Sequence, residues 1–559
     1  MRIARGRLTV RGGKEPWAFT LNEESQGRIA VKLTLGTGVS WCSEAPARES
    51  GNPPSTAKYD RVDRMVGLPD SPPPELCPQI PSVANVLLIN LDDARVDGLE
   101  LMPTVQQRLI PESVSFSNAF TPVSLCCPSR ASILSGLRLV HHQVLTLTGP
   151  LGGAHRFREF GSDQQTFATW AQSQGRVTAL IGKYLNSYDP STEELGDGAM
   201  YVPPGWSTWL AAQSPEYYGG ALGGAYTWVF GDGTSQQQVG FEGACVDGPC
   251  APQDDATYRT DVEAMAIEQV IRDAHAADRR WVVYWTPSAP HVGFDLVPKP
   301  ALRHDGVFAG LAPHRPPSWN EADASDKPPH VQLAPDTASV IELGDDMRLG
   351  AFDSLLAVDE GIARLLDLLE SLEIADGAGG TQPMLAETAV ILTSDNGVTW
   401  GEHRLFLQGK GYPYEEAQRV PLLVRMPGGT PRSVAESALT YDIAPTVAEL
   451  AGVAAPAGLD GRSLVPLLQG ETPAPPWRSD YCMEYVPWTP EPVLPREVPR
   501  YQGVNDVANG LKWVEYVDGV RELYDLAVDP FELDNRADDP AYAADQARLS
   551  ARLAEICAP

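Results

Sequence analysis

The sequence predicts a large α/β fold with a central sheet flanked by helices, a smaller C-terminal antiparallel sheet and an N-terminal β extension. Two observations predict the central sheet. From residue 84 onward, short apolar segments alternate with amphipathic ones, the pattern of a sheet layered with helices. Four of the apolar segments are followed at once by polar or ionisable residues: 85–90, 177–181, 281–285 and 389–393. Ligands of open α/β sheets collect beyond such strand ends, so this edge is the expected site.

The other elements follow from local patterns. The alternation at 29–35 predicts a strand, and the Pro-rich run 71–74 predicts a linker. A helix is predicted between the third and fourth strands, because its apolar residues fall on one face: Leu355, Val358, Ile362, Leu365, Leu366 and Leu369. Near the C-terminus, 511–517 and 522–525 predict a small antiparallel sheet.

The chain is 559 residues long, enough for one large domain and a smaller one. We expect three parts: residues 1–83 as the β extension with its linker, 84–430 as the catalytic α/β domain, and 431–559 as the C-terminal subdomain.

The charge balance restricts the partners. There are 43 basic and 73 acidic residues, a formal net charge of -30, which argues against nucleic acid or anionic membrane as a broad partner. Any anionic substrate must be attracted locally, by a metal ion or a few buried cations. The basic N-terminal start lacks a following apolar segment, so the expected location is cytoplasmic as written, or periplasmic or secreted if an upstream signal was removed. Cys245 with Cys250 and Cys42 with Cys77 are candidate disulfide pairs, but neither spacing establishes an oxidising compartment.

Two polar sequences follow predicted strands and suit a metal ion. Asp92 and Asp93 follow the first strand, and Asp395 with Asn396 follows the fourth. Adjacent buried carboxylates need a compensating cation, and oxygen ligands suit a hard divalent ion. Taken one at a time, both sequences are also typical of solvated turns.

The most specific motif runs from Cys126 through Pro128, Ser129 and Arg130 to Gly136. It resembles the signature of the sulfatase family, in which the first cysteine is oxidised to formylglycine. The hydrated aldehyde carries two hydroxyls on one carbon: one attacks sulfur, and the other later expels sulfate as the aldehyde re-forms. The resemblance covers roughly residues 84–540 and implies an alkaline-phosphatase-like mixed sheet. The Cys-Cys-Pro-Ser-Arg form, with Lys183-Tyr-Leu-Asn186, is most similar to the glucosamine-6-sulfatase and arylsulfatase branch.

The resemblance also implies roles for individual residues. The metal ligands would be Asp92, Asp93, Asp395 and Asn396 with residue 126, for Ca²⁺ in most members and Mg²⁺ in some. The catalytic set would comprise Cys126, Arg130, Lys183, His291, His403 and Lys410. Within it, the two lysines would hold sulfate oxygens, His291 would lie near the leaving group, and His403 would line the pocket. A formylglycine-generating enzyme would be the maturation partner, reading Pro128 and Arg130.

One position departs from the family pattern. Many sulfatases have Lys-x-His where this chain has Lys183-Tyr184-Leu185, so the histidine that steadies the formylglycine hydroxyl is missing. His142 and Asn186 are the two candidates to replace it.

The sequence therefore predicts a sulfuric ester hydrolase acting on a small-molecule or carbohydrate sulfate ester. Aryl sulfates, 6-sulfated amino sugars and sulfated polysaccharide units all remain open. The alternatives are a phosphonate monoester or phosphodiester hydrolase with the same site, a non-catalytic binding protein with unmodified Cys126, and a metal-dependent phosphatase that uses the cysteine itself.

Overall fold

The computed structural model describes the side chains of residues 83, 85–188, 201–212, 258–293, 296–332, 338–376, 379–405, 409–473, 476–487 and 498–558, apart from single positions. It also describes the backbone of several short strands elsewhere. The chain divides into two compact units, Met1–Pro81 and Ser82–Pro559. In the first unit, β1 (Arg2–Ala4) pairs with β2 (Arg7–Thr9), and β3 (Arg28–Leu35) pairs with β4 (Val39–Pro46), both antiparallel.

The second unit is built on a ten-stranded mixed sheet with the order β11-β10-β9-β8-β12-β5-β15-β16-β6-β17. Its five central strands, from β9 to β15, run parallel, and antiparallel pairs join them to the outer strands on both sides. The strands are β5 (Asn85–Leu91), β6 (Ser113–Phe116), β8 (Val177–Lys183), β9 (Thr208–Ala212), β10 (Tyr226–Phe230), β11 (Gln236–Val239), β12 (Trp281–Thr286), β15 (Thr388–Ser394), β16 (Leu422–Arg425) and β17 (Arg432–Val434).

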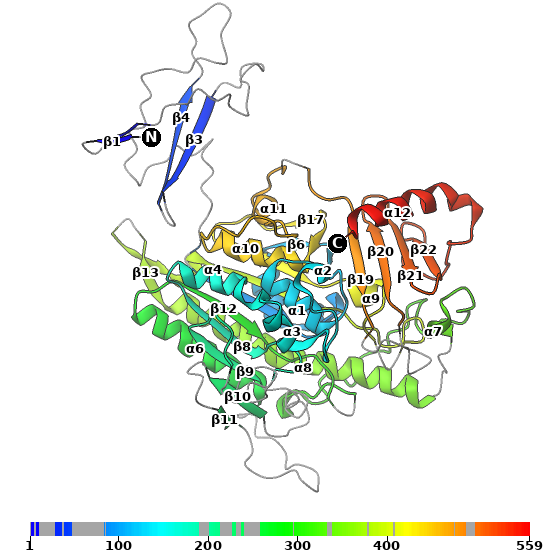
Figure 1. The fold of residues 1–559 in the computed structure, drawn as a ribbon. Coiled ribbons are helices and arrows are strands. Elements are labelled where there is room, and N and C mark those ends of the chain that lie inside the picture. The colour runs from blue at the N-terminus through cyan, green and yellow to red at the C-terminus, as the bar shows by residue number, and fades with distance from the viewer. Residues whose placement is uncertain are drawn as a thin grey trace, which may run out of the picture. The chain divides into compact units, whose positions relative to one another are not determined.

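Helices cover both faces of this sheet (Figure 1). Neighbouring strand residues point to opposite faces, so Leu88 joins one core and Ile89 the other. The first core contains residues of α1 (Cys126–Ser135), α4 (Phe167–Ser173) and α10 (Ile443–Leu450). The second contains residues of α6 (Arg259–Ala276) and the long α8 (Ala338–Ser371). The other α-helices of the described residues are α2 (Leu139–His142), α3 (Gly153–Glu159), α7 (Pro329–Gln332), α9 (Glu415–Gln418), α11 (Val465–Gln469) and α12 (Ala543–Ile556).

The four predicted buried strands are confirmed as β5, β8, β12 and β15. The helix predicted between the last two is α8, which buries Leu355, Val358 and Ile362. The mixed α/β fold is thus as expected, whereas the domain boundaries at 83 and 430 stay predictions.

The predicted C-terminal sheet has four antiparallel strands: β19 (Tyr481–Tyr485), β20 (Tyr501–Asp506), β21 (Leu511–Tyr516) and β22 (Arg521–Asp525). Figure 1 shows it in orange beside the red helix α12. Leu549 of α12 packs on this sheet in a small core with Val504, Trp513 and Leu523.

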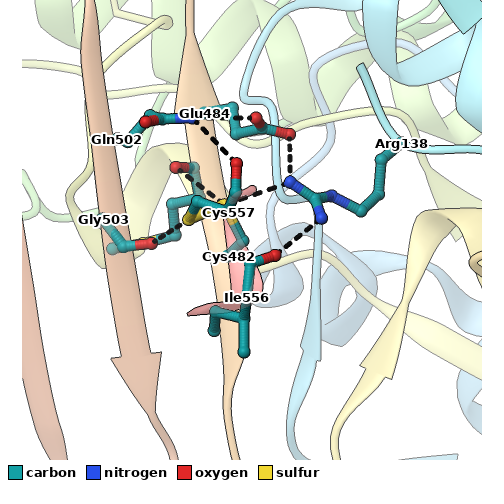
Figure 2. The surroundings of a disulfide bond; sticks show 8 residues. Arg138, Cys482, Glu484, Gln502, Gly503, Ile556 and Cys557 are labelled. Carbon is teal, nitrogen blue, oxygen red and sulfur yellow. Dashed lines mark hydrogen bonds and ion pairs between the residues drawn. A yellow bond between two sulfur atoms is a disulfide. The ribbon is translucent and has the colours of Figure 1, made fainter. Parts of the chain in front are cut away.

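A disulfide bond joins Cys482 of β19 to Cys557, just after α12, across 75 residues of sequence. Figure 2 shows Arg138 beside it, donating to the Ile556 carbonyl at 2.6 Å and pairing with Glu484 at 3.3 Å. Sequence spacing did not suggest this pair. The pairs that it did suggest, Cys245 with Cys250 and Cys42 with Cys77, lie outside the side chains described.

Among the described residues, the helices are all too short or too polar to cross a membrane.

Candidate active site

The carboxyl ends of β5, β8 and β15 bring distant polar residues together. β15 runs parallel to β5 with Ser394 opposite Leu91, so Asp395 and Asp92 leave the sheet side by side. Lys183 is the last residue of β8, two strands away from β5. Because parallel strands end at one edge, residues far apart in sequence meet there.

The acidic residues form a tight buried group. Asp92, Asp93 and Asp395 each offer a carboxylate oxygen, and these oxygens lie within 4.8 Å of one another. Asn396 Nδ2 donates to Asp93 Oδ1 at 2.6 Å, and the Asp93 N–H donates to Asp395 Oδ1 at 3.2 Å. All four side chains are buried, Asp93 the most exposed of them at 4%.

This group fits a hard divalent cation. Two of its buried oxygens, Asp92 Oδ1 and Asn396 Oδ1, have no hydrogen-bond partner within the described part of the chain. Buried polar atoms are rarely left unpaired, and carboxylate and amide oxygens are the ligands of Ca²⁺ and Mg²⁺. Burial raises the pKa of Asp395 to about 6, although the Arg130 guanidinium acts in the opposite direction. A divalent ion would favour the ionised carboxylates further.

Three cations surround the carboxylates. Lys183 Nζ donates to Asp92 Oδ2 at 2.6 Å, and Lys410 Nζ lies 2.7 and 2.8 Å from the two oxygens of Asp93. Arg130 Nε donates to Asp395 at 2.6 Å. Burial alone would raise the pKa of Asp92, but Lys183 and the other nearby cations hold it below its usual range. Since three cations already balance three carboxylates, a bound divalent ion would make the site positive inside an acidic protein.

Cys126 lies at the start of α1 against this group. Its Sγ accepts from Lys410 Nζ at 2.9 Å and lies 3.9 Å from Asp93 Oδ1, and the side chain is only 1% exposed. The Ser129 hydroxyl donates to the Asp395 carbonyl at 2.5 Å, which fastens α1 to the loop after β15. Gly136 ends the helix with φ +73°, a conformation that favours glycine. The motif therefore places its first cysteine beside the oxygen-rich group.

His291 completes the cluster. Its Nδ1 lies 2.8 Å from the Val292 carbonyl, which makes Nδ1 the protonated nitrogen and leaves Nε2 to face Asp93 Oδ2 at 3.7 Å. Burial, with Lys410 nearby, lowers the pKa of His291 to about 4, so the ring is neutral at pH 7.

His403 lies in a different group. Its Nδ1 is 3.0 Å from Glu321 Oε2, its Nε2 is 3.9 Å from Glu416, and its ring stacks on Tyr414 with centroids 4.0 Å apart. The structure thus brings together every predicted site residue except His403.

The two candidate replacements for the missing histidine, His142 and Asn186, differ in the hydrogen bonds that they make. His142 is fully buried, with Nε2 3.0 Å from Ser132 Oγ and with Nδ1 accepting from the Val144 N–H at 3.1 Å. Both ring nitrogens are therefore engaged away from Cys126. Asn186 lies three residues beyond Lys183, and its carbonyl accepts from the Ala154 N–H at 2.8 Å.

Sequence reasoning missed two hydroxyls that hold the strand ends together. Ser129 was part of the motif but had no assigned role. Ser394 Oγ accepts from the Ala94 N–H at 2.9 Å and donates to the Asn396 carbonyl at 2.9 Å, linking the loops after β5 and β15. A serine directly before Asp395 was the only available signal for this link.

Comparison with known proteins agrees with this geometry. The family model for sulfatases matches residues 84–453, and the model described as N-sulphoglucosamine sulphohydrolase, C-terminal, matches residues 401–558. The putative extracellular sulfatase Sulf-1 homolog of Caenorhabditis elegans is 31% identical over 420 residues, which cover 72% of this chain and 53% of that protein. The N-acetylglucosamine-6-sulfatase of Homo sapiens is 29% identical over 408 residues, covering 72% and 67%. The chain thus spans about half the length of the first of these relatives.

Two solved structures share the fold. The first is a protein solved in complex with its own substrate, D-glucosamine-2-N,6-O-disulfate. It matches with TM-score 0.64 and 22% identity, covering 85% of this chain and 97% of that one. The other is a phosphonate monoester hydrolase from Silicibacter pomeroyi, with TM-score 0.63 and 24% identity, covering 84% and 94%. The family model accounts for most of the chain, including the strand ends that carry the acidic group and the helix that carries Cys126. The chain therefore belongs to the sulfatase family.

Proposed function

We propose that the chain hydrolyses a sulfate monoester, using a formylglycine made from Cys126 and one divalent metal ion. The observation that carries the proposal is the position of the Cys126 side chain. Its Sγ lies 2.9 Å from Lys410 Nζ and 3.9 Å from Asp93, at the edge of a buried set of oxygen ligands. A hydrated formylglycine at this position would supply a hydroxyl that attacks sulfur and a second one that later releases sulfate.

The ligands of the ion would be Asp92, Asp93, Asp395 and Asn396, with residue 126. The three aspartates and Asn396 all offer oxygen atoms, which favours Ca²⁺, with Mg²⁺ as the alternative. Arg130 would keep Asp395 in place, since its Nε donates to that carboxylate and its Nη1 donates to the Lys183 carbonyl at 3.1 Å.

The cations would bind the anionic ester. Lys183 and Lys410 each present an ammonium at the edge of the carboxylate group. Lys183 is buried and Lys410 is 19% exposed, so water screens both charges less than at the surface. They would hold the non-bridging sulfate oxygens and stabilise charge in the transition state.

His291 would transfer the proton to the leaving alcohol. The Val292 carbonyl fixes the ring so that Nε2 faces the site. The ring is neutral at rest because its pKa is lowered to about 4, and the negative charge of the bound ester would raise that pKa, so that Nε2 takes up a proton from water and gives it to the leaving oxygen. His403 is left out of this scheme, because its contacts lie with Glu321 and Glu416.

Modification of Cys126 would precede folding. All ten residues of α1 are buried, including Pro128 and the Arg130 side chain at 1% exposure. A formylglycine-generating enzyme could therefore reach this motif only in the unfolded chain.

The unmodified thiol is a poor nucleophile in this setting. Burial raises the pKa of Cys126 to about 11, even though Lys183 and Lys410 lower it. The thiolate is the reactive form, so a phosphatase that uses the cysteine itself would need the bound cation to lower this pKa.

We propose a 6-sulfated amino sugar as the substrate class. Two similar proteins support it: the human relative is named an N-acetylglucosamine-6-sulfatase, and the first solved structure holds a 6-O-sulfated glucosamine. The buried disulfide and a relative described as extracellular favour an oxidising compartment as the place of action.

The first test is tandem mass spectrometry of the tryptic peptide Leu109–Arg130 from protein expressed with a formylglycine-generating enzyme. We expect an aldehyde or its hydrate at position 126. A free thiol there after co-expression would reject the formylglycine mechanism and favour a binding protein.

The second test compares sulfate and phosphonate esters of one leaving group. We expect a higher kcat/KM for the sulfate ester. A higher value for the phosphonate would instead assign the chain the activity that names the Silicibacter pomeroyi protein.

A further inference from the structure

The segment that carries Lys410 is anchored at successive residues. The Gly411 N–H donates to the Ser124 carbonyl at 2.7 Å, and the Ser124 hydroxyl donates to the Tyr412 carbonyl at 2.8 Å. Gly411 has φ +86°, and a Cβ there would lie 2.8 Å from the Tyr485 ring, so only glycine fits. These contacts tie the segment to the chain just before Cys126.

The next anchors come from the C-terminal sheet and from Glu532, in the loop after β22. Lys512 Nζ donates to the Pro413 carbonyl at 2.9 Å, and the Tyr414 hydroxyl donates to Glu522 at 2.8 Å. The Glu415 N–H donates to Glu532 Oε2 at 2.8 Å. Residues 411–415 are therefore held from both sides, by the loop before α1 and by the C-terminal sheet.

Lys512 is the centre of the second set of contacts. It lies on β21 and is fully buried, and its ammonium donates to the Pro413 carbonyl and forms ion pairs with Glu415 at 2.9 Å and Glu532 at 2.7 Å. Burial alone would lower the pKa of Lys512, but the two carboxylates outweigh it and raise the pKa, so the charge is retained. A buried ammonium held by one hydrogen bond and two carboxylates favours one local geometry.

We propose that Lys512 is a positioning residue of the active site, which holds residues 411–415 so that Lys410 Nζ stays against Asp93 and Cys126. The inference rests on the proposed role of Lys410 in binding the ester. It makes the C-terminal sheet part of the active site's construction, although none of the site residues described above comes from it. Misplacement of a binding group by about 1 Å can cost about 100-fold in rate, so small shifts of this segment matter.

The test variant is the double substitution Lys512→Met with Glu532→Gln. Lys512→Met alone would leave Glu532 buried without a cation, which is strongly destabilising. Glu415 keeps its ion pair with Arg419 at 2.7 Å, so the double variant leaves neither Glu415 nor residue 532 as a carboxylate without a cation. A glutamine at 532 still offers an oxygen to the Glu415 N–H.

We expect the double variant to lower kcat/KM for a sulfate ester by about 10- to 100-fold. In the Lys410→Ala background the same double substitution should cause little further loss, because Lys512 acts through Lys410. Wild-type kcat/KM in the double variant, or losses that multiply in the combined variant, would overturn the proposal.

Asp506→Asn is the matched control. Asp506 is a buried residue of the same sheet, and it pairs with Arg548 at 2.6 Å and accepts from Asn509. We expect its loss to lower the melting temperature with unchanged kcat/KM. An equal fall of kcat/KM in this control would assign the effect to general destabilisation and reject a positioning role.

A structural readout separates this inference from the proposed function. Hydrogen exchange of the Gly411 and Glu415 amides should be faster in the double variant and unchanged in Asp506→Asn. If the wild type hydrolyses neither ester, the proposed function fails and the exchange result alone decides. Unchanged protection of both amides would then overturn the positioning role.

Discussion

Lys410 joins three features of the site, since its ammonium contacts both oxygens of Asp93 and the sulfur of Cys126. Replacing it with alanine should lower kcat for a sulfate ester by about 10²- to 10³-fold, the usual cost of losing one donor to the transition-state charge. The fold should persist, because the side chain is 19% exposed and water can enter its place.

Steady-state kinetics and thermal unfolding of Lys410→Ala test this prediction together. Lys410→Arg is the control, because it keeps the charge and should retain more activity. Wild-type turnover in the alanine variant would remove Lys410 from the mechanism.

Contacts at the residue scale also separate the two histidines of the prediction. His291 follows Ala289-Pro290 and His403 follows Gly401-Glu402, and neither short sequence shows whether its histidine faces the site. In the structure, Nε2 of His291 faces Asp93, whereas His403 stacks on Tyr414. Their roles depend on which distant element packs against each ring.

At the scale of elements, α2 packs on α1 through the buried ring of His142. Burial lowers the pKa of His142 to about 3, below its ordinary value of 6.5. Between these values the unfolded chain binds a proton that the folded chain does not. The contribution of His142 to stability is therefore complete above pH 6.5 and is lost as the pH falls toward 3.

We expect His142→Asn to reduce this acid sensitivity, because asparagine has no proton to gain and its oxygen can accept from the Val144 N–H. From about pH 7 to about pH 4.5, the variant should lose about 2–3 kcal/mol less unfolding free energy than the wild type. Urea unfolding at the two pH values measures the difference. Equal losses in both proteins would show that His142 does not bind the proton.

At the scale of the whole molecule, the disulfide bond joins the segment just after α12 to β19. The cross-link spans 75 residues, so it restricts the unfolded state strongly. Replacing Cys482 and Cys557 with alanine should lower the unfolding free energy by about 2–4 kcal/mol.

Thermal unfolding with and without a reducing agent measures this contribution. Reductant should lower the melting temperature of the wild type and leave the double alanine variant unchanged. The same melting temperature for oxidised wild type and variant would show that the bond adds no stability.

Much of the fold and of the site could be predicted from the sequence, because both depend on local patterns. Buried parallel strands are continuous apolar segments, so β5, β8, β12 and β15 were visible as such. The candidate metal ligands come directly after β5 and β15, and parallel strands end at one edge of the sheet. Asp92 and Asp395 were therefore expected to meet, although 303 positions separate them.

Only the tertiary structure decided how the rest of the chain supports this edge. The pairing of Cys482 with Cys557 and the contact of Lys512 with Pro413 leave no mark in either local sequence. Each joins segments whose approach depends on how the C-terminal sheet packs. The sequence by itself thus determined the strands, the motif and the ligand types, because periodicity and residue chemistry are local. Which buried side chains hold Lys410 in place was decided by packing between elements distant in sequence, and no local pattern encodes it.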